Sequence, residues 1–248
     1  MIESLRALCR RSTLLVSANR GVRFGLEHYK AATRAQRWRR ARTGVIKSYL
    51  GSHSVCKLQV GSRDNILPDW LNTDLEPVDD RVVFLDAREL FPFADETLDY
   101  IFSEHTLEHL TYSEGVFCLR ECHRILKPGG RMRIATPDLN KILGLCARAR
   151  SETQERYIQR SIDRHFPELG LNAPSLVVNN FFQSWGHRFI YDADTLEMAV
   201  KGAGFCDLRW FTPGESEDAN LRGLEAHDRV IGDDMNRFET MIAEAARI

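Results

Sequence analysis

Four short apolar runs, each followed by a glycine or a polar residue, constrain the fold of this 248-residue chain more than any other feature. The runs occupy residues 55–60, 81–85, 98–102 and 131–135. Residues 114–126, between the third and fourth runs, carry Val116, Leu119 and Cys122 at helical spacing. Short strands that alternate with helices indicate an α/β protein whose parallel sheet has helices on both faces.

The region after residue 138 continues this pattern with a long interruption. Residues 139–168 read as helical, and a loop rich in asparagine and aromatic residues follows, so we predict that residues 139–190 form a lid-like insertion. Asp194 is the expected N-cap of a helix that ends near residues 202–204. Residues 205–211 and 236–246 are predicted to be two late strands.

The first 50 residues form a separate region, predicted to be a basic helical extension before a domain at 51–248. Residues 1–55 hold twelve lysines and arginines against two glutamates, a net charge of +10, whereas the remainder carries −11. One interpretation is a solvated helix that packs on the domain. The other is contact with a polyanion such as an anionic membrane surface, with Trp38 as an interfacial anchor.

Composition excludes several classes of protein. Apolar residues make up 43% of the chain, while glycine and proline number only 16 and 8, so disorder and collagen are not expected. No apolar run reaches the roughly 18 residues of a membrane span. Six irregularly spaced cysteines do not resemble a disulfide framework, and we therefore expect a cytoplasmic location, with peripheral membrane association as an extension of it.

The residues that follow the strands predict a ligand site, because ligands bind at the carboxyl ends of the strands in such sheets. Gly61 permits a close approach of the backbone to a ligand. Asp74 follows a strand at about residues 70–73, where a carboxylate suits the two hydroxyls of a ribose. Asp86 follows the next run, where it can accept a hydrogen bond from an adenine amino group.

Five blocks of sequence resemble the class I S-adenosylmethionine-dependent methyltransferases of the small-molecule type. They are LQVGS at 58–62, LNTDL at 71–75, DARELFPFADETLDYI at 86–101, SEHTLEHL at 103–110 and RILKPGGR at 124–131. The resemblance implies a Rossmann-like seven-stranded methyltransferase sheet, mostly parallel with an antiparallel last strand. It also implies S-adenosylmethionine as the cofactor.

The resemblance also implies which residues contact the cofactor. Gly61, Ser62 and Arg63 correspond to the loop around its methionine part, Asp74 and Leu75 to the ribose corner, and Asp86, Ala87 and Arg88 to the adenine corner. Ser103 and Glu104 correspond to the strand end beside the reactive methyl group. The chain departs from the usual Gly-x-Gly-x-Gly pattern, because only Gly61 remains.

The acceptor is predicted from a looser resemblance to a subgroup associated with polysaccharide and lipopolysaccharide biosynthesis, carried by Gly61 through Asp74. It implies O-methylation of a sugar hydroxyl on a glycan, a glycolipid or another small molecule. A hydroxyl is a poor nucleophile, so a general base helps, and histidine has a suitable pKa. His105 is the first candidate and His187 the second. Four aromatic residues could stack on a sugar or pack inside the lid: Phe181, Phe182, Trp185 and Tyr191.

His105, Glu108 and His109 also form a His-x-x-Glu-His pattern like that of some zinc proteases. The pattern is short and lies within a methyltransferase block, so a protease is not expected. Two histidines argue against Mg²⁺, which prefers oxygen ligands. No metal ligand is therefore predicted, although the sequence leaves divalent metal binding by these three residues open.

Two alternatives stay open at this stage. The basic first 50 residues favour a nucleic-acid methyltransferase. However, the segment after residue 102 lacks the Asn/Asp-Pro-Pro-aromatic sequence common in enzymes that methylate bases, which makes nucleic acid an unlikely partner. The reduced glycine loop instead favours a non-catalytic binding module with a methyltransferase fold. The oligomeric state is not predicted.

Overall fold

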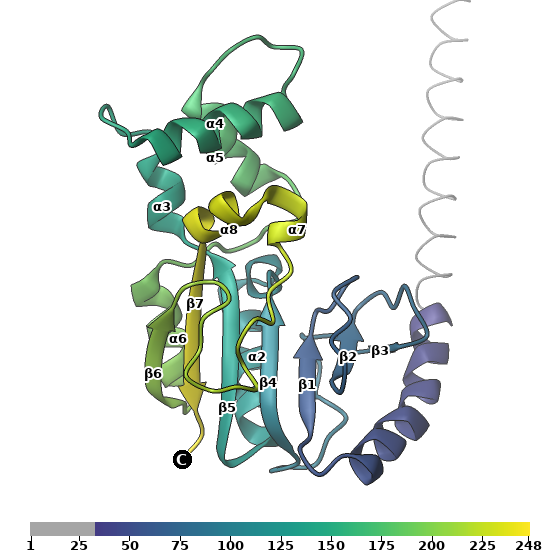
Figure 1. Ribbon diagram of the computed structural model, residues 1–248. Helices are drawn as coiled ribbons and strands as arrows, with labels where there is room; N and C mark the ends of the chain where they lie inside the picture. The colour runs from purple at the N-terminus through teal and green to yellow at the C-terminus, as the bar shows by residue number, and fades with distance from the viewer. Residues whose placement is uncertain (1–32) are drawn as a thin grey trace, which may run out of the picture. The chain divides into compact units, whose positions relative to one another are not determined.

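The computed structural model describes residues 33–248, drawn in colour in Figure 1. The chain divides into two units, residues 1–45 and 46–248. Residues 33–52 are helical. The first 32 residues of the predicted basic extension lie outside the described residues, so the interpretations of that segment stay predictions. In residues 33–248, the structure has no helix that is both long and apolar enough to cross a membrane.

The second unit is built on a seven-stranded sheet in the order β3-β2-β1-β4-β5-β7-β6. Strands β1 to β5 pair in parallel, whereas β7 is antiparallel to both of its neighbours. The predicted sheet, mostly parallel with an antiparallel last strand, is therefore confirmed. The strands are β1 (Lys57–Val60), β2 (Leu71–Asp74), β3 (Val82–Phe84), β4 (Leu98–Glu104), β5 (Leu126–Pro137), β6 (Cys206–Phe211) and β7 (Thr240–Ala246).

Seven α-helices and one short 3₁₀ helix follow residue 104 in the described chain. They are η1 (Leu107–His109), α2 (Tyr112–Ile125), α3 (Leu139–Gly144), α4 (Glu152–His165), α5 (Pro174–Gln183), α6 (Ala193–Gly202), α7 (Asp228–Ile231) and α8 (Asp233–Glu239). Helix α2 begins at a capping box between Thr111 and Glu114, which satisfies its first N–H groups. Helix α6 begins at Asp192 rather than at the predicted Asp194, because Asp192 forms the capping box with Thr195.

Only one face of the sheet carries the expected helices. Helices α2 and α6 pack together, and the hydrophobic core beneath them includes Leu58, Ile101, Leu119 and Leu196. The three connections that join β1 to β2, β2 to β3 and β3 to β4 are turns and loops instead of helices. The prediction of helices on both faces was therefore wrong for the first four strands.

The other face is covered by the β6–α7 segment, which we define as residues 212–227. In Figure 1 this segment runs in front of β5 and β4 before it reaches α7. Leu221 and Leu224 pack there against Trp70 and Phe102. Burial of these side chains stabilises the segment on the sheet, and this burial replaces the contact that a crossover helix would make.

Helices α3, α4 and α5 form a second hydrophobic cluster with α8. Its buried members include Ile142, Ile158, Phe181 and Met235. Figure 1 shows these helices beyond one end of the sheet. The strands β4 and β5 point toward this end, and β7 begins there. Residues 139–190 thus lie beside the carboxyl ends of the central strands, where the sequence predicts the ligand site.

Candidate functional site

The loop after β1 is held tightly against β2. Gly61 has a φ of +75°, and a Cβ at this position would lie 2.0 Å from Oγ1 of Thr106. A side chain therefore does not fit here, which explains the glycine. The backbone N–H groups of Gly61 and Ser62 both donate to the carbonyl of Thr73, at 2.9 and 2.8 Å. These two N–H groups are thus used within the protein and do not face a ligand.

The side chain of Ser62, unlike its backbone, is available to contact a ligand. Its side chain is buried, and its Oγ has no hydrogen-bond partner among residues 33–248. A buried hydroxyl without a partner costs free energy, so such an atom needs an explanation. A polar group of a bound ligand would supply the missing partner.

Asp74 lies at the end of β2, and its carboxylate accepts hydrogen bonds from the loop after β1 and from the loop after β2. Its Oδ2 accepts from the N–H of Arg63 at 2.9 Å, and its Oδ1 accepts from the N–H of Glu76 at 2.8 Å. A carboxylate offers about four lone-pair sites, so both oxygens can still accept from a ligand hydroxyl. Leu75, the next residue, is exposed and adds apolar surface beside this carboxylate.

The third corner is closed by an ion pair. Arg88 donates from Nε to Oδ1 of Asp86 at 2.8 Å and from Nη2 to Oδ2 at 2.7 Å. This bidentate pair raises the pKa of the Arg88 guanidinium. Ala87 packs against the main core. Asp86 is buried beneath Arg88, so an adenine amino group would have to share its oxygens with the guanidinium.

The end of β4 is joined to the β6–α7 segment through Glu104. Its carboxylate accepts from the backbone N–H groups of Ala226 and His227, each at 3.0 Å. Burial raises the pKa of Glu104, and these two hydrogen bonds oppose the rise. Ser103, the preceding residue, is buried. Glu104 therefore fixes the position of residue 227 beside the carboxyl edge of the sheet.

His105 follows directly, with a φ of +46°, and lies in a polar cluster. Its Nδ1 is 2.9 Å from Oε1 of the buried Glu108, and its Nε2 is 3.3 Å from Oγ1 of Thr240. Burial by itself would lower the pKa of His105, but the hydrogen bond and the charge of Glu108 outweigh it and raise the pKa. Conversely, burial would raise the pKa of Glu108, and His105 holds it low.

A second histidine–carboxylate pair stacks on the first. The rings of His105 and His227 lie 3.9 Å apart between centroids. His227 Nε2 is 3.1 Å from Oε1 of Glu239, whose Oε2 accepts from the hydroxyl of Tyr157. Burial, followed by the charge of Glu239, raises the pKa of Tyr157 well above its usual range. The sequence analysis missed His227 and Glu239, which no motif marks and which lie more than 120 residues beyond His105.

His187, the second candidate base, lies on the other side of Glu108. Its Nδ1 is 2.7 Å from the carbonyl of Phe181, an arrangement that makes Nδ1 the donor and leaves Nε2 as an acceptor. Its ring lies 5.0 Å from that of His109. Burial lowers the pKa of His187, so the ring is neutral near pH 7.

The four aromatic residues of the predicted lid fall into two pairs. Phe181 and Tyr191 are buried and belong to the core. Phe182 and Trp185 are 48% and 49% exposed, which leaves large apolar surface open. The Trp185 ring lies 5.5 Å from that of His187. A half-exposed indole thus lies beside a neutral histidine.

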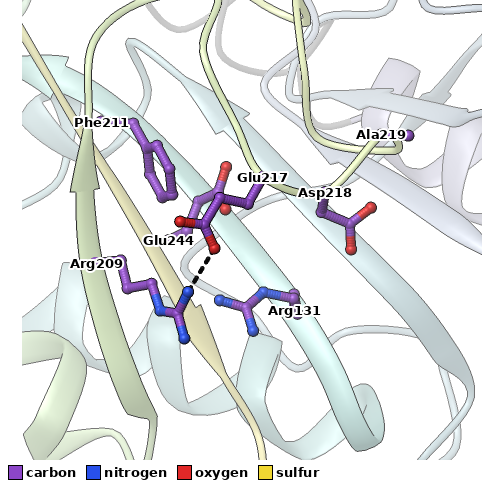
Figure 2. A pocket seen from close by; sticks show the side chains of 7 residues that line it. All are labelled: Arg131, Arg209, Phe211, Glu217, Asp218, Ala219 and Glu244. Carbon is purple, nitrogen blue, oxygen red and sulfur yellow. Dashed lines mark hydrogen bonds and ion pairs between the residues drawn. The ribbon is translucent and has the colours of Figure 1, made fainter.

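A pocket of about 380 Å³ lies away from these residues (Figure 2). It lies on the sheet face beneath the β6–α7 segment, and an ion pair between Arg209 and Glu217 crosses it at 2.6 Å. Arg131 and Asp218 also line it. Its polar lining is already paired in part, and it contains none of the predicted site residues.

S-adenosylmethionine, the cofactor that the resemblance implies, fits part of this edge of the sheet. The unpartnered Ser62 hydroxyl and the available Asp74 lone pairs match a polar ligand with a ribose. The backbone at Gly61 leaves no room for a side chain, and the N–H groups of Gly61 and Ser62 are not available to a cofactor because they donate to Thr73. At the adenine corner, the guanidinium of Arg88 competes for the oxygens of Asp86.

Comparison with known proteins agrees with this description. Residues 68–134 match a family described as a methyltransferase domain. No curated protein matches the chain. The match agrees with the resemblance to methyltransferases over these 67 residues, and S-adenosylmethionine is the cofactor that this resemblance implies.

Solved structures with a similar fold are distant in sequence. A SAM-dependent methyltransferase from Archaeoglobus fulgidus is 18% identical over 87% of this chain and 94% of its own, with a TM-score of 0.46. A phosphoethanolamine N-methyltransferase from Haemonchus contortus, in complex with S-adenosylmethionine, is 15% identical over 84% of this chain and 52% of its own, with a TM-score of 0.40. These likenesses are too distant to indicate an acceptor.

Proposed function

We propose that this chain transfers a methyl group from S-adenosylmethionine to a hydroxyl of a sugar, on a glycan or glycolipid. The methyltransferase-domain match over residues 68–134 supports the reaction class. The observation that carries the acceptor is the pairing of half-exposed Trp185 with His187. An exposed aromatic face can stack on a sugar ring, and a histidine beside it can reach the ring's hydroxyls.

The cofactor, when bound, supplies an activated methyl group on a sulfonium. The chain's own residues then have to bind, orient and remove a proton. Asp74 would hold the ribose hydroxyls, and the buried hydroxyl of Ser62 would bind a polar group of the methionine part. Gly61 keeps this corner free of a side chain. Such fixed positioning of two reactants supplies a large part of the rate enhancement in group transfer.

We assign proton removal to His187 rather than to His105. Both ring nitrogens of His105 lie within hydrogen-bond distance of Glu108 or Thr240. His187 has one nitrogen held by the Phe181 carbonyl, so its Nε2 can accept a proton from the acceptor hydroxyl. The lowered pKa of His187 keeps this nitrogen unprotonated at neutral pH. The proton of the acceptor hydroxyl would thus pass to Nε2 of His187.

The lid-like insertion at residues 139–190 has two roles in this proposal. Its helices α3, α4 and α5 hold His187 and Trp185 against the carboxyl edge of the sheet through their own buried cluster. They would also exclude water from the reacting atoms. We retain the cytoplasmic location and peripheral membrane contact through residues 1–50 as parts of the proposal, because glycolipid acceptors lie at membranes.

The test is methyl transfer from radiolabelled S-adenosylmethionine to a panel of glycan and lipid-linked sugar acceptors, with wild type beside H187Q and H165Q. His165 serves as the matched control because its ring also contacts Trp185, at 5.2 Å. We expect kcat to fall about 100-fold or more in H187Q and little in H165Q. Transfer to a nucleic acid in preference to sugars, or equal kcat in all three proteins, would refute the proposal.

A further inference from the structure

We propose that His105, His227 and Glu239 form a binding site for a first-row transition-metal dication such as Zn²⁺. One ligand atom from each residue lies within 4.8 Å of the other two. The three side chains come from the end of β4, from the residue before α7 and from the end of α8. Their convergence is therefore a property of the fold and not of a local sequence motif.

The donor set defines the class of metal. Two imidazole nitrogens and one carboxylate oxygen are the protein ligands of many catalytic zinc sites and of the facial triads of other first-row metals. Mg²⁺ and Ca²⁺ instead select oxygen ligands. Three protein ligands leave at least one coordination position open, which a water or a substrate oxygen can occupy.

Two of the three ligands, His105 and Glu239, also form a hydrogen bond that can orient them toward a metal. Metal-bound histidines usually donate their second N–H to a carboxylate or a carbonyl, which orients the ring. Glu108 is placed to accept from His105 Nδ1 at 2.9 Å, so a metal would bind at His105 Nε2 in place of the 3.3 Å contact with Oγ1 of Thr240. Glu239 is held in the same way, because the Tyr157 hydroxyl donates to its other oxygen.

The charge of the cluster also favours a bound cation. The side chains of Glu108 and Glu239 are 0% and 5% exposed, and each lies within hydrogen-bond distance of a histidine ring. A buried carboxylate is costly unless it is paired, so further positive charge beside these two carboxylates is favourable. A dication between the two histidines would lie next to Glu239 and close to Glu108, and it would neutralise both.

The ligands are held in place by contacts that do not involve the metal. The backbone N–H groups of Ala226 and His227 bind the Glu104 carboxylate at the end of β4. Asn65 donates to the carbonyl of Leu224 at 3.0 Å, which ties the same segment to the loop after β1. A site assembled before the metal arrives loses less conformational entropy on binding.

A second group near this site is less suited to a metal. Glu108, His109 and His187 also bring three ligand atoms together. However, both oxygens of Glu108 are engaged, one by His105 and the other by Thr136 at 3.2 Å. His109, the other imidazole of this group, is exposed to solvent. This group therefore serves as the competing site in the test.

The test is calorimetric titration of chelator-treated protein with Zn²⁺ and, separately, with Mg²⁺, followed by metal analysis after dialysis. Wild type is compared with H227Q, E239Q and H187Q, all without S-adenosylmethionine. We expect one Zn²⁺ per chain in wild type and H187Q, and at least tenfold weaker binding in H227Q and E239Q. Zn²⁺ at 100-fold above its Kd should raise the Tm of wild type by about 5–10 °C.

Three results would overturn the metal site. They are no saturable Zn²⁺ binding by the folded wild type, Mg²⁺ binding as tight as Zn²⁺ binding, and loss of Zn²⁺ in H187Q but not in H227Q. Circular dichroism of each variant shows that it is folded, and the two independent ligand variants guard against failure of one of them. The experiment contains no methyl donor, so its failure leaves the proposed methyl transfer standing.

Discussion

Arg133 on β5 is the residue whose replacement should destabilise the β6–α7 segment most. Its side chain is 0% exposed and lies between Glu225 of that segment and Glu244 of β7. It donates to Glu225 from Nε at 2.5 Å, and from Nη1 to Glu244 at 2.6 Å and to the carbonyl of Glu215 at 2.8 Å. Substitution R133M keeps most of the volume and removes the charge.

The expected loss follows from the burial of both carboxylates, which are 4% and 1% exposed. Removing one partner of a buried ion pair costs about 3–5 kcal/mol, because the other charge stays buried without compensation. For a domain of this size that loss lowers the Tm by roughly 6–20 °C. In R133M the buried carboxylates of Glu225 and Glu244 lose their counter-charge, so neutralising them, by acid or by substitution, should reduce the deficit.

The assay is urea unfolding of wild type, R133M and the triple variant R133M/E225Q/E244Q at pH 7 and pH 5. The triple variant lacks the buried charges, so it should recover part of the free energy of unfolding. A loss below about 1 kcal/mol in R133M, or a deficit that grows as the pH falls, would refute the reasoning. In either case the ion cluster would not be what fixes the segment to the sheet.

Three further predictions concern single side chains. Substitution G61A should cost at least about 1–2 kcal/mol in unfolding free energy, because φ is positive and the new Cβ meets Thr106; an unchanged Tm would contradict this. The hydrogen bond from Arg124 lowers the pKa of Glu121, so the ionised Glu121 stabilises the fold at pH values above its usual pKa of 4.5. The difference in unfolding free energy between wild type and E121Q should therefore disappear as the pH falls. A difference that stays constant with pH would argue against this role of Glu121. Substitution W185A should weaken acceptor binding more than cofactor binding in calorimetry, and equal weakening of both would exclude the stacking role.

The ends of the first three strands could be predicted because each strand is followed or ended by a residue with a distinct role. Gly61, Asp74 and Asp86 mark three successive carboxyl ends, and the residues before them form buried strands. The last strand was harder, because Ala243 and its neighbours are poor strand formers. Burial between β5 and β6 outweighs that propensity.

The coverage of the second sheet face could not be predicted from local patterns. It depends on the β6–α7 segment, which contacts strands at least 92 residues away through Leu221, Glu225 and Ala226. Such contacts leave no periodic signal in the sequence. The start of β7 shows the same limitation, since residues 236–239 belong to α8, where Met235 packs into the cluster of the lid helices.

The candidate site was predictable only where a motif lies on consecutive residues. His105 and Glu108 stood out because they share one block, and the structure brings them into hydrogen-bond contact. His227 and Glu239 join them only through folding, and neither lies in a recognisable pattern. The ion pair between Arg88 and Asp86 could not be predicted from the sequence either, because two charged side chains two residues apart at a strand end can point away from or toward each other.

The central claim is that this edge of the sheet binds S-adenosylmethionine, and calorimetric titration of wild type, D74A and D79A tests it most directly. Asp79 is the matched control, since it pairs with Arg81 on the surface. We predict saturable binding by wild type and D79A, and a Kd about tenfold or more higher in D74A, because the ribose loses its charged acceptor. Absence of binding by folded wild type, or equal affinity in all three proteins, would contradict the claim and favour a non-catalytic binding module.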